Sequence, residues 1–133
     1  MFVFFTFLLA CGPCPSGEAL CDEQCIQVEA TSAFLSENIF SKSCAFSSCH
    51  SNASSASAGL QLHDEPSLLA LINKPSAQDP NKMLILPKDP QNSYLVKKMR
   101  GENIAENTDS MPPNASLCEA KIELVEEWIL GLE

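Results

Sequence analysis

Seven cysteines in a chain of 133 residues constrain this protein more than any other feature of its sequence. A single domain of this size has a modest core and often needs cross-links or a bound group for stability. The cysteines form a group near the start, a close pair in the middle and one near the end: Cys11, Cys14, Cys21, Cys25, Cys44, Cys49 and Cys118. This uneven spacing predicts different chemical roles for them.

The first ten residues, MFVFFTFLLA, carry no charge and end directly before Cys11. The run is shorter than the ~20 apolar residues that cross a bilayer, and is typical of an export signal. Leu8-Leu9-Ala10-Cys11 resembles a bacterial lipobox, in which cleavage precedes the cysteine and the cysteine receives lipid. We predict a signal peptide at 1–10, lipidation of Cys11, and a location on the periplasmic side or at the outer membrane. No basic residue precedes the apolar run, which departs from the usual pattern of such signals. The alternative is a plain secretory signal with a coincidental cysteine.

The net charge of −9 narrows the range of partners. An acidic surface repels phosphate backbones, so we do not expect nucleic acid to bind. Membrane contact is expected through the lipid anchor alone. An acidic surface favours protein partners that carry a basic patch.

Helical patterns dominate the chain after residue 30. Apolar residues recur at helical spacing in the last segment, where Ile122, Val125, Ile129 and Leu132 form a stripe widened by Trp128. No convincing pair of strands is visible. We therefore predict an all-α domain at 31–133 behind a cysteine-rich lead-in at 11–30 that has little core of its own. Its helices are expected from Thr31, at 66–72, at 91–100 before Gly101, and at 118–132.

The stretch Cys44-Ala45-Phe46-Ser47-Ser48-Cys49-His50 indicates a covalent haem site. Two thiols can bond the two vinyl groups of haem, and a histidine beside the second thiol can coordinate the iron. The usual spacing is Cys-x-x-Cys-His, and here it is two residues longer. We predict that Cys44, Cys49 and His50 hold one covalent haem c.

Met111 is the candidate for the second axial ligand of the iron. A thioether suits haem iron, and the prolines that follow Met111 stiffen the segment around its sulfur. His/Met ligation raises the reduction potential and leaves no open position on the iron, which favours electron transfer over catalysis. His63 is an alternative ligand, whereas Met83 and Met99 are expected to be core or surface residues.

Two other interpretations of the same residues remain open. Cys44 and Cys49 could form a disulfide, with His50 a bystander. Cys44, Cys49 and His50 could also bind zinc, but no fourth ligand stands at a zinc-like spacing. No catalytic triad, carboxylate pair or phosphate-binding loop is visible, so we do not expect an enzyme.

The remaining cysteines are Cys14, Cys21, Cys25 and Cys118, an even number that fits two disulfides in an oxidising compartment. Three of them lie close together, so one bridge should be local and the other should tie the lead-in to Cys118. The sequence does not choose among the three possible connectivities.

The order of these motifs resembles the planctomycete-type cytochrome c domain of the cytochrome c superfamily. The resemblance covers about 39–132 and rests on the Cys…Cys-His element together with five further segments. These are Ile39-Phe40, Ala58-Gly59-Leu60-Gln61-Leu62, Pro87-Lys88-Asp89-Pro90-Gln91-Asn92-Ser93-Tyr94-Leu95, Met111-Pro112-Pro113 and Trp128-Ile129. The spacing of the two cysteines departs from the family pattern.

The resemblance implies a small cytochrome-c-like helical fold packed around one covalent haem, with Met111 as the distal ligand. It implies single-electron transfer with redox proteins of the envelope. The alternative function is a haem-free, disulfide-stapled envelope lipoprotein or binding module. The sequence does not indicate an oligomeric state.

Overall fold

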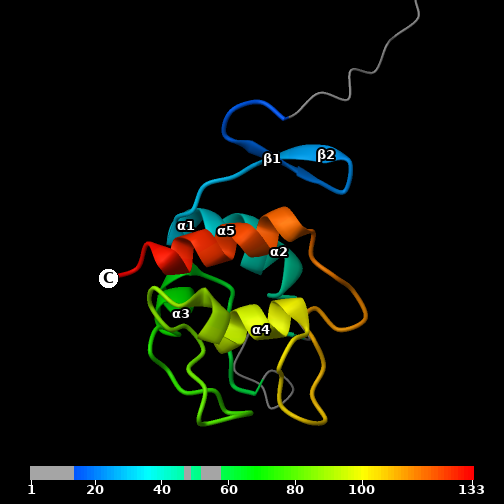
Figure 1. Cartoon of the computed structure of the whole chain (residues 1–133). Coiled ribbons are helices and arrows are strands. Elements are labelled where there is room, and N and C mark those ends of the chain that lie inside the picture. The colour runs from blue at the N-terminus through cyan, green and yellow to red at the C-terminus, as the bar shows by residue number, and fades with distance from the viewer. Residues whose placement is uncertain (1–13, 47–48, 52–57) are drawn as a thin grey trace, which may run out of the picture.

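The computed structural model describes residues 14–46, 49–51 and 58–133. The predicted signal peptide at 1–10 and the lipidation of Cys11 lie outside the described residues. The prediction of an all-α fold is wrong. An antiparallel hairpin of β1 (Glu18–Cys21) and β2 (Gln24–Gln27) precedes a set of short helices, so the fold is a small, mixed, disulfide-rich one (Figure 1).

The hairpin closes through a two-residue turn at Asp22 and Glu23. Cys21 pairs with Gln24, and Glu18 pairs with Gln27 at the open end. Asp22 and Glu23 both have positive φ, at 49° and 67°, as a turn that matches the twist of the strands requires. Glycine or asparagine usually marks such a turn, and neither residue stands here, which explains why the sequence concealed the hairpin.

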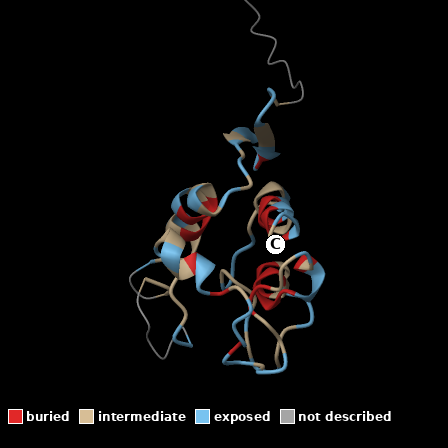
Figure 2. Ribbon diagram, turned by 90° about the vertical axis from the view of Figure 1, so that its left-hand side faces the viewer, coloured by how far each residue is buried: buried red, intermediate tan, exposed pale blue. Residues whose placement is uncertain are grey.

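Two disulfides anchor the hairpin, and they confirm the predicted division into one local bridge and one bridge to Cys118. Cys14 is bonded to Cys25, and Cys21 is bonded to Cys118 across 97 residues of sequence. Cys21 is the one buried residue among residues 14–30. The hairpin therefore stands at one end of the helical part and adds little to its core (Figure 2).

A helical segment follows the hairpin in three parts: α1 (Ser32–Leu35), η1 (Ser36–Phe40), which has π-helical hydrogen bonding, and α2 (Ser41–Ser43). The side chain of Thr31 accepts a hydrogen bond from the backbone N–H of Phe34 at 3.3 Å. Thr31 therefore caps the start of this segment.

The later helices begin and end near the expected positions. They are α3 (Glu65–Leu69), η2 (Pro90–Asn92), α4 (Tyr94–Arg100) and α5 (Glu119–Leu130). Asp64 caps α3 by accepting from the N–H of Ser67. Gly101 ends α4 in the left-handed conformation with φ 70°, as predicted, and a Cβ there would lie 3.1 Å from Ser110.

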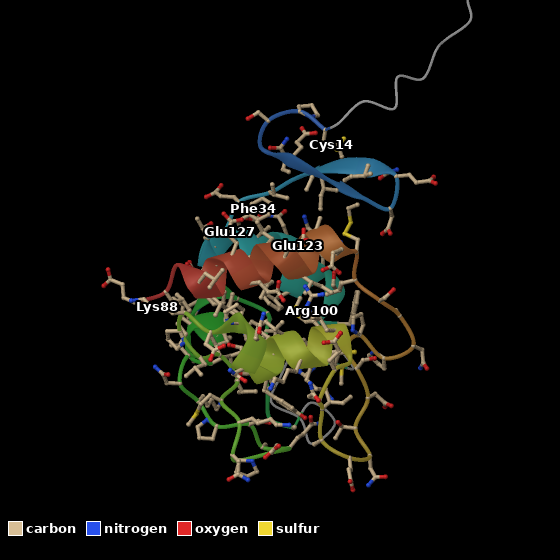
Figure 3. The ribbon with its side chains drawn as sticks, viewed as in Figure 1. Cys14, Phe34, Lys88, Arg100, Glu123 and Glu127 are labelled. Carbon is tan, nitrogen blue, oxygen red and sulfur yellow. A yellow bond between two sulfur atoms is a disulfide. The ribbon has the colours of Figure 1, made fainter. Side chains whose placement is uncertain are left out.

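One buried cluster joins the helices. Ile39 and Phe40 belong to it together with Val125 and Ile129 of α5. Helix α5 lies directly against α4, and Arg100 of α4 bonds Glu126 and Glu119 of α5, each at 2.8 Å (Figure 3). The core thus sits between the helices.

The part of the chain that the structure describes contains no helix that is both long and apolar enough to cross a membrane.

Candidate functional site

A cavity lies beside α4, and its wall joins segments that are far apart in sequence. It contains about 830 Å³ of space, part of which is open to solvent. Its walls come from Phe40, Cys44 and His50, from the segments at 58–62 and 74–78, from one face of α4, and from Leu84 and Met111. Most of these side chains are apolar, so the cavity suits a hydrophobic group with a few polar attachments.

His50 lies in the cavity wall with one ring nitrogen already bonded. Its Nδ1 is 3.0 Å from the backbone oxygen of Leu60. A carbonyl oxygen only accepts, so Nδ1 carries the hydrogen in this bond and Nε2 keeps its lone pair in the neutral ring. A bond from the other ring nitrogen to a backbone carbonyl is the usual way in which proteins orient a histidine that ligates a metal.

Backbone hydrogen bonds hold the predicted attachment segment in shape. The N–H of His50 donates to the oxygen of Cys44 at 3.1 Å, which closes the seven-residue stretch into a loop. The N–H of Cys49 donates to Phe46 within this loop, and the N–H of Leu62 donates to His50. Cys44 and His50 therefore lie next to each other at the two ends of this stretch.

The two cysteines of this loop differ in position. Both cysteines are half-buried; Cys44 contributes to the cavity wall and Cys49 does not. Burial, followed by the charge of Cys49, raises the pKa of the Cys44 thiol to about 11. Neither of the two disulfides among the described residues uses Cys44 or Cys49.

Met111 reaches the same cavity from the segment between α4 and α5, as the prediction requires. Met99, which was expected to be a core or surface residue, also lines the cavity and is 6% exposed. The structure therefore presents two thioethers to one space. The difference between them is that Met111 stands on an irregular segment, whereas Met99 is fixed on the buried face of α4.

His63 is not part of the cavity wall. It is exposed, and its Nε2 lies 3.1 Å from Asp64 at the start of α3. The zinc alternative also lacks support, because Cys44, Cys49 and His50 do not bring three donor atoms within 4.8 Å of one another. The one such group among the described residues contains Cys21 and Cys118, which are bonded to each other.

Lys98 is a buried cation in the cavity wall that sequence reasoning missed. It lines the cavity from α4, it is 7% exposed, and its Nζ has no hydrogen-bond partner among the described residues. Desolvation lowers its pKa from the ordinary value for lysine. Lys98 stands four residues after Tyr94 and next to Met99, so helical spacing places it on the apolar face of α4. This spacing is the signal in the sequence from which Lys98 could have been predicted.

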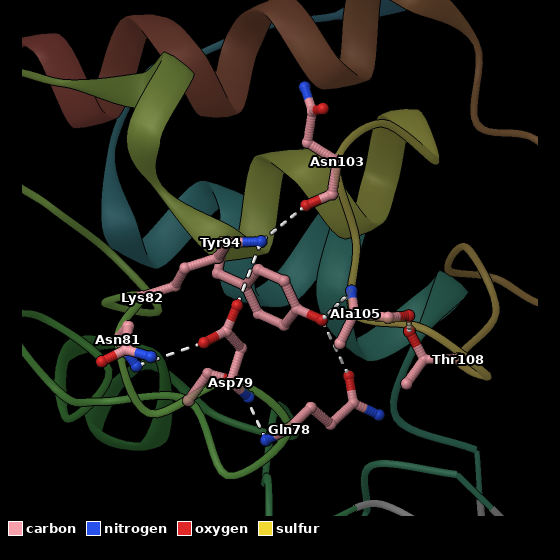
Figure 4. Close-up of polar contacts among 9 residues, drawn as sticks. Gln78, Asp79, Asn81, Lys82, Tyr94, Asn103, Ala105 and Thr108 are labelled. Atoms are coloured by element: carbon pink, nitrogen blue, oxygen red, sulfur yellow. Dashed lines mark hydrogen bonds and ion pairs between the residues drawn. The ribbon is translucent and has the colours of Figure 1, made fainter.

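The hydroxyl of Tyr94 connects two segments near the cavity by hydrogen bonds. Its hydroxyl accepts from the backbone N–H of Ala105 at 3.0 Å and lies 3.3 Å from Oε1 of Gln78 (Figure 4). Beside it, Lys82 bonds both Asp79 and the backbone oxygen of Asn103. The segment at 74–85 is thus tied to the segment that leads to Met111.

The site therefore combines one oriented imidazole, two thioethers, a half-buried thiol and a buried cation around an apolar space. No family model, curated protein or solved structure was found to be similar to this chain.

Proposed function

We propose that this protein is an exported, lipid-anchored, monohaem c-type cytochrome that carries single electrons. Cys44 and Cys49 would hold the haem covalently, and His50 and Met111 would ligate its iron. The observation that carries the proposal is the position of His50. Its Nδ1–H bond to Leu60 leaves Nε2 available in the wall of an apolar cavity that Cys44 and Met111 also line.

The residues of the site fit this cofactor in chemical type. Haem is a large apolar ring, and the cavity is bounded by side chains such as Phe40, Leu62 and Leu95. The longer spacing between the cysteines is compatible with attachment, because the loop returns His50 to Cys44 by a backbone hydrogen bond. When bound, the haem would supply a one-electron couple whose potential a His/Met pair raises.

The chain itself would exclude water and hold the ligands. Phe40 and Leu84 are buried beside the cavity and keep the surroundings of the iron apolar. The bond from His50 to Leu60 fixes the imidazole orientation and raises its basicity as a ligand. With His50 and Met111 both holding the iron, the bound haem would favour electron transfer over reactions at the metal.

The proposed location and partners rest on the sequence. The two disulfides are compatible with an oxidising compartment outside the cytoplasm. An acidic chain of net charge −9 suits redox partners with a basic patch. Phe46, which is exposed on the attachment loop, would offer such a partner an apolar contact close to the haem.

The second candidate is a haem-free envelope module stapled by disulfides. The bridge from Cys21 to Cys118 favours it, because this bridge and the core stabilise the chain without any cofactor. In this function the cavity would bind a small apolar molecule.

An absorption spectrum distinguishes the two functions. The protein is expressed with a c-type haem maturation system, and the reduced form is examined before and after denaturation in alkaline pyridine. Under the proposal, a sharp reduced band survives denaturation in the wild type, and it is lost when both cysteines are replaced in Cys44→Ala/Cys49→Ala. His50→Ala should lose the low-spin spectrum, whereas the matched control His63→Ala should keep it. A colourless wild-type product would overturn the cytochrome proposal.

A further inference from the structure

We infer that Lys98 binds a carboxylate of the cofactor, as the counter-ion of a haem propionate inside the cavity. This inference rests on the proposed function and deepens it, because it assigns the binding of the polar end of the haem.

The first observation is the burial of the ammonium group without a partner. Lys98 is 7% exposed, and its Nζ is the one buried side-chain nitrogen or oxygen without a hydrogen-bond partner among the described residues. An unpaired buried cation is strongly unfavourable, and proteins keep such a group where it pairs with an opposite charge.

The second observation is the place of this group. Lys98 contributes to the wall of the same cavity as His50 and Met111, so an anion that pairs with it must belong to an occupant of the cavity or to the wall. Asp109 is the acidic residue that attracts Lys98 electrostatically, but it forms no ion pair with it. Lys74, the other charged residue of the wall, is also a cation.

The third observation concerns the neighbouring cations of α4. Lys97 is less buried than Lys98 and does not line the cavity. Arg100 forms ion pairs with Glu119 and Glu126. Among the basic residues of α4, Lys98 alone faces the cavity. An occupant that is apolar over most of its surface and carries a carboxylate would satisfy both the wall and the cation, and haem has this character.

The test compares haem-loaded Lys98→Met with Lys97→Met, which removes the same charge from the same helix. A cation at a propionate disfavours the oxidised iron, so Lys98→Met should lower the midpoint potential and shift the propionate bending band of the resonance Raman spectrum. Lys97→Met should leave the Raman band unchanged and shift the potential less. Lys98→Arg keeps the charge and should retain the wild-type Raman band and potential.

The outcomes separate this inference from the proposed function. Covalent haem in the wild type and in Lys98→Met, with identical Raman bands and potentials, would overturn the role of Lys98 and leave the cytochrome intact. Maturation of Lys98→Arg but not of Lys98→Met would support the need for a cation. A wild type without covalent haem would overturn both. If Lys98 pairs with Asp109 instead, Lys98→Met leaves the propionate bending band unchanged, and the inference is wrong.

Discussion

The backbone N–H of Met111 donates a hydrogen bond to the backbone oxygen of Lys98, with 2.7 Å between the two atoms. Lys98 lies in the last turn of α4, whose final carbonyls have no partner within the helix. The bond therefore satisfies a helix end and at the same time holds Met111 beside α4. This position brings the sulfur-bearing residue into the wall that Lys98 also forms.

Replacing Met111 by leucine should remove the sulfur ligand while keeping the apolar volume. We expect Met111→Leu to retain covalent haem, to lose the long-wavelength charge-transfer band of the oxidised protein, and to lower the midpoint potential, because methionine ligation raises it. Absorption spectra and potentiometric titration of the haem-loaded protein measure these changes.

Met99→Leu is the matched control for Met111→Leu, since Met99 is the other thioether of the cavity. It should keep the charge-transfer band and stay close to the wild-type potential. Loss of the band in Met99→Leu, with retention in Met111→Leu, would assign the iron ligand to Met99.

The sequence predicted the positions of the helices, and several residues of the cavity wall, better than it predicted the fold class. Gly101 ended α4 where expected, and the apolar spacing from Ile122 to Ile129 produced the buried face of α5. The hairpin was missed because its strands have four residues each and bury only Cys21. Strands so short and exposed show no alternation of apolar and polar residues.

The polar details of the site had weaker signals in the sequence. The acceptor for His50 is a backbone oxygen, and any residue at position 60 would supply one, so no side chain reveals this bond. The connection at Tyr94 depends on the N–H of Ala105 for the same reason. These contacts depend on how loops pack in three dimensions, and local sequence patterns do not encode that packing.

Tyr94→Phe should loosen the segment that carries Met111. Tyr94 is 1% exposed, and without its hydroxyl the N–H of Ala105 loses its acceptor. A buried donor left unsatisfied costs about 1–3 kcal/mol in the free energy of unfolding. We expect a loss of this size in urea unfolding of the haem-loaded protein, together with a weaker charge-transfer band.

Gln78→Leu serves as the control for Tyr94→Phe. It removes the contact between the hydroxyl and Oε1 of Gln78 but keeps the bond to Ala105 (Figure 4). Its charge-transfer band should match that of the wild type. An equal weakening in both variants would show that the bond to Ala105 does not hold the ligand segment.

The two disulfides should differ in their effect on stability. In the chain-entropy account, a bridge restricts the unfolded chain more when it closes a longer loop. The separations are 97 residues for Cys21–Cys118 and 11 residues for Cys14–Cys25. We expect Cys21→Ala/Cys118→Ala to lose about 4–5 kcal/mol, and Cys14→Ala/Cys25→Ala to lose about 3 kcal/mol. Denaturant midpoints measure both losses, and the reverse order would contradict the dominance of loop length.

The thiol of Cys44 should be unreactive in the folded, haem-free chain. Its pKa is about 11 against an ordinary value of 9.0, because burial disfavours the thiolate. Only the thiolate is alkylated, so at pH 8 iodoacetamide should modify Cys44 roughly a hundredfold more slowly than in urea, a factor of ten for each pKa unit. Peptide mapping by mass spectrometry with the disulfides intact measures the rate.

The same shift fixes the direction of a pH effect on stability. Between about pH 9 and pH 11 the folded chain holds a proton on Cys44 that the unfolded chain releases, so raising the pH through this window should lower the free energy of unfolding. Cys44→Ala should remove this part of the pH dependence. Lys121 lowers the pKa of Cys44, so Lys121→Gln should slow alkylation further. Faster alkylation in Lys121→Gln, or equal rates in the folded and unfolded wild type, would contradict a buried Cys44 thiol in the cavity wall.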